Sequence, residues 1–301
     1  MTHYDLVASN KRRSILVVAG FMFFITVLSY LVTQVLGYDL SLVGVALIFS
    51  GLMSFASYYY SDSIILTLSG ARPATRQEFF DFFTVAENLA MSQKIPVPKL
   101  YVIDDSAMNA FATGRDPQHA VIVATTGLLS RLNRSEIEGV VAHELSHVIN
   151  YDMLLMSIVT ILVGMVALLS DFMFRFSLGS RRSRDDNENS SGLGMVLFIA
   201  AIILALLSPL IAQLIQLAIS RRREFLADAS GVAMTKNPQG LINALQKLDA
   251  DKEPLEAANK ATAHLYITNP LKNRKDAIGW FAGLFETHPP IASRVEALKS
   301  I

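Results

Sequence analysis

The five residues His143-Glu144-Leu145-Ser146-His147 place two metal-binding side chains beside one acid. Residues four apart lie one above the other on an α-helix, so His143 and His147 can reach the same metal ion. Glu144 lies about 100° further round such a helix, where its carboxylate can hold a water bound to that ion. The spacing is typical of a zinc hydrolase, and the alternative is an amphipathic helix whose histidines have no joint role.

A helix must carry this motif for the spacing to have meaning. Ser135 and Glu138 have the S-x-x-E spacing of a capping box, which predicts a helix that starts at about 136. Apolar residues recur at helical spacing through the motif, at Ile137, Val140, Val141, Leu145 and Val148. The sequence therefore predicts that both histidines share one helix.

A catalytic zinc usually has three protein ligands and one water, so a third ligand must come from elsewhere. Cysteine is absent, which leaves histidine and carboxylate ligands. Glu224 and Asp228 stand four apart after a long apolar stretch, so they share a helix face. One can bind the metal while the other accepts the N–H of a liganding histidine. The alternative is a solvated acidic pair beside the three arginines at 221–223.

The composition indicates a membrane protein. Hydrophobic residues make up 52% of the 301 residues and charged residues 17%. The net charge is zero, so nothing favours nucleic acid as a partner. Four apolar stretches are candidates to cross a bilayer, the third being short and the fourth holding Pro209: 14–36, 40–61, 153–170 and 189–220. The predicted fold is an α-helical integral membrane protein of about four spans.

Basic residues predict its orientation. Lys11, Arg12 and Arg13 precede the first stretch and place the N-terminus in the cytoplasm. The loop between the last two stretches also carries arginines, which disagrees with an exterior position. If both of these stretches cross the membrane, or neither does, Glu224 returns to the side of His147. The site is then expected to face the cytoplasm.

The soluble segments predict an α+β catalytic domain interrupted by a hydrophobic hairpin. We divide the chain into an N-terminal transmembrane hairpin, a first catalytic part, a second hairpin and a second catalytic part: 1–62, 63–152, 153–220 and 221–301. Short β-branched runs predict strands at 100–103 and 120–124. We expect an extended substrate to pair with an edge strand such as 120–124.

Four motifs occur in order along the chain: N-A-F-A-T-G at 109–114, H-E-x-x-H at 143–147, E-x-x-A-D at 224–228, and T-H-P-P at 287–290 followed by Arg294. Together they resemble the HtpX family of membrane-bound zinc endopeptidases, which is related to the CAAX prenyl proteases. The resemblance covers essentially the whole chain. It implies a zincin-like (gluzincin) catalytic domain and one Zn²⁺ per chain.

The resemblance also implies roles for individual residues. His143, His147 and Glu224 would bind zinc, Glu144 would be the general base, and Asp228 would support a ligand. His288 would lie near the site and stabilise an oxyanion, with Arg294 supporting it. Asn109 would border the substrate cleft. The alternatives for these last three are a loop histidine, a helix-surface arginine and a turn-stabilising asparagine.

The predicted function is hydrolysis of peptide bonds in misfolded or damaged membrane proteins, as part of a stress response. An intramembrane site-2-type protease is a rival, but charged residues flank the motif at Arg131, Arg134, Glu136 and Glu138. A non-catalytic zinc-binding scaffold or transporter is another, but a structural zinc usually has four protein ligands. Polypeptides and the lipid bilayer are the expected partners, and no residue pattern specifies an oligomer.

Overall fold

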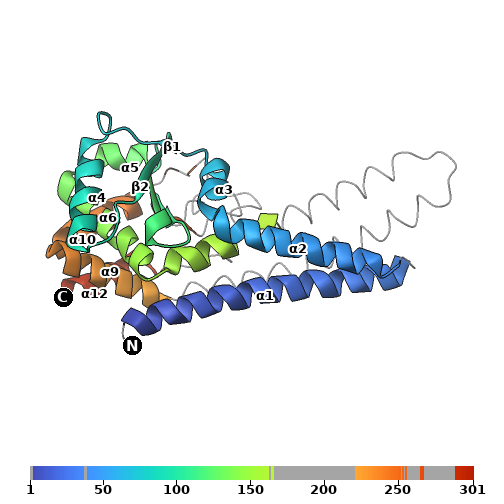
Figure 1. The fold of residues 1–301 in the computed structure, drawn as a ribbon. Coiled ribbons are helices and arrows are strands. Elements are labelled where there is room, and N and C mark those ends of the chain that lie inside the picture. The colour runs from blue at the N-terminus through green and yellow to red at the C-terminus, as the bar shows by residue number, and fades with distance from the viewer. Residues whose placement is uncertain are drawn as a thin grey trace.

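The computed structural model describes residues 3–36, 39–162, 164–165, 221–251, 253, 255, 265–267 and 289–301. Two long helices, α1 (His3–Leu36) and α2 (Ser41–Tyr59), lie side by side and extend away from the mixed helix-and-strand part of the chain (Figure 1). Both are long and apolar enough to cross a membrane, at Asp5–Leu31 and Ser41–Tyr59. The two N-terminal spans predicted from hydropathy are therefore present, although α1 begins well before the first predicted stretch.

Of the second predicted hairpin, at 153–220, the structure describes only the first residues. A helix at Asp152–Leu162 follows α6 (Arg134–Ile149) and is bent by 82° from it, and the bent pair together is a third candidate span. The fourth predicted span, at 189–220, lies outside the described residues. The count of four spans and the division of the chain into four segments stay predictions.

The other elements form the α+β part. They are α3 (Ser61–Leu68), β1 (Arg72–Pro73), α4 (Phe80–Ser92), β2 (Lys99–Ile103), β3 (Ala110–Thr113), the 3-10 turn η1 (Pro117–His119), β4 (Val121–Thr125), α5 (Thr126–Arg131), α9 (Arg221–Thr235), α10 (Pro238–Ala250) and α12 (Ile291–Lys299). Both predicted strands are confirmed within a residue at each end, and β3 forms an antiparallel hairpin with β4.

The strand order in the sheet is β1-β2-β4-β3. β4 pairs with β2 in parallel and with β3 antiparallel, so it lies inside the sheet. The expectation that 120–124 is an edge strand was therefore wrong, and among the described residues β3 is the edge strand on that side. All five residues of β4 are buried, as expected for a strand that is covered on both faces.

Two hydrophobic clusters cover the two faces of the sheet. Ile122 and Ala124 belong to the cluster that contains α4, α6 and α10. Val121 and Val123 point the other way, into a cluster with α3 and the helix Asp152–Leu162. Burial on both faces fixes the register of β4, because a shift by one residue would exchange the two sets. The sheet therefore provides a rigid support for the helix α6.

The start of α6 differs from the prediction. Asn133 caps the helix, with its Oδ1 accepting from the backbone N–H of Glu136 at 3.0 Å, and Glu136 Oε2 accepting from Asn133 N at 2.8 Å. The capping box predicted at Ser135 and Glu138 was therefore displaced by two residues. Lys247 of α10 also pairs with Glu136, at 2.7 Å, so the capped end of α6 is tied to α10.

Candidate metal centre

Two helices that are distant in the sequence bring the predicted ligands together. His143 and His147 lie on α6 and Glu224 lies on α9, and all three are at most 5% exposed. The helices approach closely at Gly231, where an added Cβ would lie 3.2 Å from the backbone nitrogen of His143. A residue without a side chain at this point lets α9 lie close enough for Glu224 to reach the histidines.

Two imidazole nitrogens and one carboxylate group form a triangle of the right size for one ion. The Nε2 atoms of His143 and His147 are 3.3 Å apart. Oε2 of Glu224 lies 3.7 Å from Nε2 of His143, and Oε1 lies 3.5 Å from Nε2 of His147. Tetrahedral coordination at the usual Zn–N and Zn–O distances of about 2.0–2.2 Å requires ligand separations of roughly 3.3–3.6 Å. Two acceptor nitrogens and a carboxylate therefore surround a point where a zinc-sized cation would satisfy all three.

Asp228 and Arg294 support His143. Nδ1 of His143 lies 2.9 Å from Oδ1 of Asp228, and Arg294 donates to both carboxylate oxygens at 2.8 and 2.6 Å. Burial alone would raise the pKa of Asp228, but the hydrogen bonds from Arg294 and His143 outweigh it and lower this pKa to about 2. An ionised Asp228 accepts the Nδ1–H of His143 and leaves Nε2 free to bind a metal.

A second carboxylate, which the sequence reasoning missed, supports His147. Asp152 Oδ2 lies 3.2 Å from Nδ1 of His147, and Asp152 is 3% exposed. Burial alone would lower the pKa of His147, but the hydrogen bond to Asp152 and the charges of Glu224, Asp152 and Glu144 raise this pKa to about 9. The site therefore carries enough negative charge to hold a proton or a cation on His147.

Glu144 lines a small cavity with the two histidines. The cavity has a volume of about 10 Å³, room for about one water, and it is lined by Ala112, His143, Glu144, His147, Met156, Leu265 and Ile267. Ala112 belongs to the edge strand β3. Ile267 donates its N–H to the carbonyl of Ala110 on the same strand at 3.0 Å, so it already pairs with part of this edge.

Three further predicted residues have different outcomes. Arg294 is fully buried and contacts Asp228, so it is not a helix-surface arginine. Asn109 is 2% exposed at the start of β3, where its Oδ1 accepts from the N–H of Ala110 at 3.1 Å. The predicted substrate contact of Asn109 stays a prediction. His288 lies outside the described residues, so its predicted role stays a prediction.

The sheet, the H-E-x-x-H helix and the carboxylate from a second helix are the arrangement of a zincin-like metallopeptidase. Residues 76–301 match the sequence model of peptidase family M48. Because this match covers most of the chain, the chain belongs to peptidase family M48 and is a metalloprotease. Membership of this family decides against a non-catalytic scaffold and implies that the protein uses a metal, for which His143, His147 and Glu224 are a possible site.

Relatives that match over nearly the whole chain show to which proteins of this family it is similar. The chain is 41% identical to a protease HtpX homolog of Dictyoglomus turgidum, over 99% of this chain and 94% of that protein. It is 39% identical to a protease HtpX homolog of Streptococcus uberis, over 98% of this chain and 99% of that protein. The predicted resemblance to the HtpX family is therefore confirmed.

A solved structure shares the fold. The crystal structure of S. mikatae Ste24p superposes with a TM-score of 0.51 at 18% sequence identity, covering 98% of this chain and 67% of that one. The likeness extends over the apolar helices as well as the α+β part, so the two proteins share an overall fold.

Proposed function

We propose that this chain is a membrane-anchored zinc endopeptidase in which His143, His147 and Glu224 bind one Zn²⁺ and Glu144 is the general base. The observation that carries the proposal is the triangle of two Nε2 atoms and the Glu224 carboxylate, with N–N and N–O separations of 3.3 to 3.7 Å, beside a cavity lined by Glu144. The donor set of two imidazoles and one carboxylate, with room for a water, is that of catalytic rather than structural zinc.

When bound, zinc would polarise the scissile carbonyl and lower the pKa of a coordinated water. Glu144 would accept the proton of that water and pass it to the leaving amine. Asp228 and Asp152 would hold His143 and His147 with their Nε2 atoms toward the metal. Arg294, which is buried against Asp228, would keep that carboxylate ionised and in place.

A substrate would bind as an extended chain along the outer edge of β3. Strand addition reads the backbone of a peptide without demanding a particular sequence, which suits an enzyme that cleaves many proteins. Ala112 of β3 lines the cavity beside Glu144, so a chain paired with β3 would pass the proposed base. Asn109, at the start of this strand, would border the same edge.

We further propose that the substrates are misfolded or damaged membrane proteins cleaved at the cytoplasmic face of a bacterial inner membrane. The two apolar helices α1 and α2 support a membrane location. Lys11, Arg12 and Arg13 near the start of α1 support a cytoplasmic N-terminus, because cytoplasmic segments carry an excess of basic residues. α1 packs against the helix that follows α6, which supports a site close to the membrane surface.

The test is casein cleavage by the purified full-length protein in detergent, with and without added zinc. The wild type is expected to cleave casein, a chelator to stop cleavage and zinc to restore it. Glu144→Gln is expected to retain zinc and lose at least ~100-fold in rate, because general-base catalysis contributes about 10²–10⁴. Glu138→Gln, a change on the same helix outside the cavity, is the control. Normal cleavage by Glu144→Gln would refute the assigned base.

A further inference from the structure

A chain of polar contacts connects the membrane helix α1 with the metal centre. Asn10 of α1 is 2% exposed, and its side-chain Nδ2 donates to Oδ1 of Asp152 at 2.7 Å and to the carbonyl of Asn150 at 2.9 Å. A buried amide needs hydrogen-bond partners, and both of these partners lie in the turn that follows α6. Asn10 therefore fixes α1 to the C-terminal end of the H-E-x-x-H helix.

Asp152 uses its two oxygens in different directions. Oδ2 faces Nδ1 of His147 at 3.2 Å, while Oδ1 accepts from Asn10 and, at 3.1 Å, from Nη1 of Arg223 on α9. The carboxylate is thus held on one side by two donors and contacts the histidine on the other. An ionised carboxylate in this position fixes both the orientation and the tautomer of the ring.

The turn that presents Asp152 is itself held by α1. Tyr151 adopts a left-handed backbone conformation, with φ of 60°, and the chain bends by 82° between α6 and the helix Asp152–Leu162. Such a conformation is costly for a bulky residue and persists where surrounding contacts hold it. The ammonium of Lys11 lies 4.3 Å from the centre of the Tyr151 ring. Apolar side chains of both helices pack alongside: Val17, Val18, Phe21, Leu154, Ile158 and Leu162.

We propose that Asp152 and Asn10 are positioning residues for His147, so that the membrane helix α1 helps to set the affinity and geometry of the metal site. The inference rests on the zinc site proposed above. His143 is supported by Asp228 and Arg294, which both lie in the C-terminal part of the family domain. His147 is supported by Asp152, which Arg223 of α9 and Asn10 of α1 both hold. Of these residues, Asn10 precedes the matched residues 76–301.

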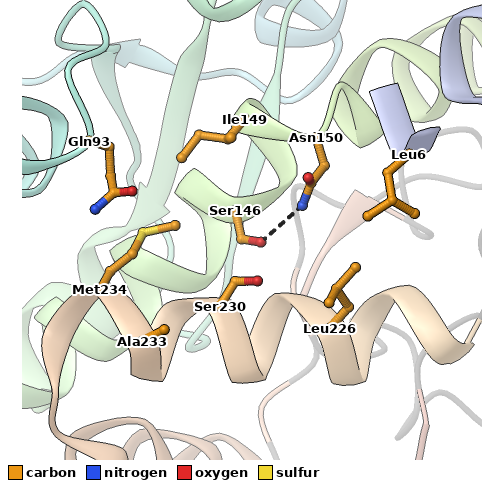
Figure 2. A pocket seen from close by; sticks show the side chains of 9 residues that line it. All are labelled: Leu6, Gln93, Ser146, Ile149, Asn150, Leu226, Ser230, Ala233 and Met234. Atoms are coloured by element: carbon orange, nitrogen blue, oxygen red, sulfur yellow. Dashed lines mark hydrogen bonds between the residues drawn. The ribbon is translucent and has the colours of Figure 1, made fainter. Parts of the chain in front are cut away.

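The same junction offers a matched control. A second cavity, of about 370 Å³, lies between α6, α9 and the start of α1. Figure 2 shows residues that border it: Leu6 of α1, Ser146 and Asn150 at the end of α6, and Leu226 and Ser230 of α9. Leu6 lies one turn before Asn10 on α1 and is partly buried there. Leu6→Ala therefore removes an apolar contact of α1 at the junction without changing the contacts of Asp152.

Zinc affinity of the full-length protein in detergent, measured by competition with a chromophoric chelator, tests the inference. Asp152→Ala is expected to weaken zinc binding by about 10- to 100-fold, as loss of a ligand's hydrogen-bonding partner typically does. Asn10→Ala should act in the same direction by up to about tenfold, because one hydrogen bond to a charged group is lost. Asn10→Asp keeps the side-chain size but opposes two carboxylates, so it should weaken binding at least as much. Leu6→Ala should bind zinc like the wild type.

A second readout separates positioning from general loss of structure. Cobalt in place of zinc gives a visible spectrum that reports ligand geometry, and at saturating cobalt Asn10→Ala and Asp152→Ala should still differ from Leu6→Ala and wild type. The inference would be overturned if Asn10→Ala, Asn10→Asp and Asp152→Ala all had the zinc affinity and cobalt spectrum of the wild type. That result would leave the proposed peptidase function standing. A wild type that binds zinc but cleaves no peptide would instead refute the proposed function and leave the inference standing.

Discussion

Arg294 and Asp228 form a buried pair with two parallel hydrogen bonds, from Nε at 2.8 Å and from Nη2 at 2.6 Å. Their side chains are 0% and 3% exposed, and they join α12, the last helix, to α9. The fork of a guanidinium matches a carboxylate in this geometry. The C-terminal helix therefore helps to hold a residue that contacts a proposed metal ligand.

Loss of this pair should destabilise the fold as well as the site. Asp228→Asn removes the carboxylate that accepts both hydrogen bonds of the buried Arg294 and leaves Glu224, at 3.9 Å, as an ion-pair partner. Breaking a buried pair in this way typically costs about 3–5 kcal/mol. We expect the free energy of unfolding of the metal-free protein, measured with denaturant, to fall by that order. Asp104→Asn makes the same change at Asp104, whose side chain is 61% exposed beside Arg72, and should change stability little. Equal effects of the two changes would contradict this account.

The pH dependence of stability should report the same pair. The pKa of Asp228 is about 2 in the folded protein, whereas the ordinary value for an unfolded chain is 3.8. The unfolded chain therefore binds this proton more tightly than the folded protein does. Ionised Asp228 then stabilises the fold fully above about pH 4, and this contribution, of order 2 kcal/mol, is lost as the pH falls toward 2. The difference in unfolding free energy between wild type and Asp228→Asn, measured on metal-free protein, should shrink over this range. A constant difference would mean that Asp228 is not the group that titrates.

Metal content should separate the two glutamates of the proposed site. Glu224→Gln removes a ligand charge from the triangle, so we expect zinc per chain, measured by elemental analysis after dialysis, to drop well below one. Glu144→Gln removes no proposed ligand and should keep its zinc. A Glu224→Gln protein with full zinc content would show that another group completes the coordination.

Pairing of Ile267 with β3 should limit access of a substrate to that edge. Ile267→Pro removes the N–H that donates to Ala110, while Ile267→Ala keeps the N–H and shortens the side chain. A net hydrogen bond is worth about 0.5–1.5 kcal/mol, so kcat/KM for an extended peptide should rise about two- to tenfold in Ile267→Pro relative to Ile267→Ala. Equal values for the two variants would show that this contact does not compete with substrate.

Helix periodicity was sufficient to predict the spacing of His143 and His147 and the shared face of Glu224 and Asp228. It could not predict Asp152, because a residue five positions after His147 on a straight helix would lie about 140° away from it. The left-handed Tyr151 and the 82° bend bring Asp152 back to the histidine, and no repeat in the sequence signals that bend. Asn10 offered no signal, because it stands next to Lys11, Arg12 and Arg13 in a polar segment ahead of the apolar stretch at 14–36.

Strand existence was predictable but strand order was not. The β-branched run at 120–124 correctly predicts a strand, yet its neighbours are set by pairing between distant segments. An uninterrupted apolar run is typical of a strand buried on both faces, which favours an interior position over the expected edge. The capping box failed for a local reason, because Asn133 and Glu136 satisfy the same spacing rule two residues earlier.

The contact between Asn10 and Asp152 has a consequence for the life of the protein before it reaches the bilayer. A newly synthesised chain whose first helix is still held by a chaperone or the insertion machinery lacks that contact. On the proposed mechanism, its second histidine is then poorly oriented and its hold on zinc is weakened. Full metal affinity would then be reached only once α1 is seated against the turn after α6, which would couple completion of the metal site to assembly of the membrane helix.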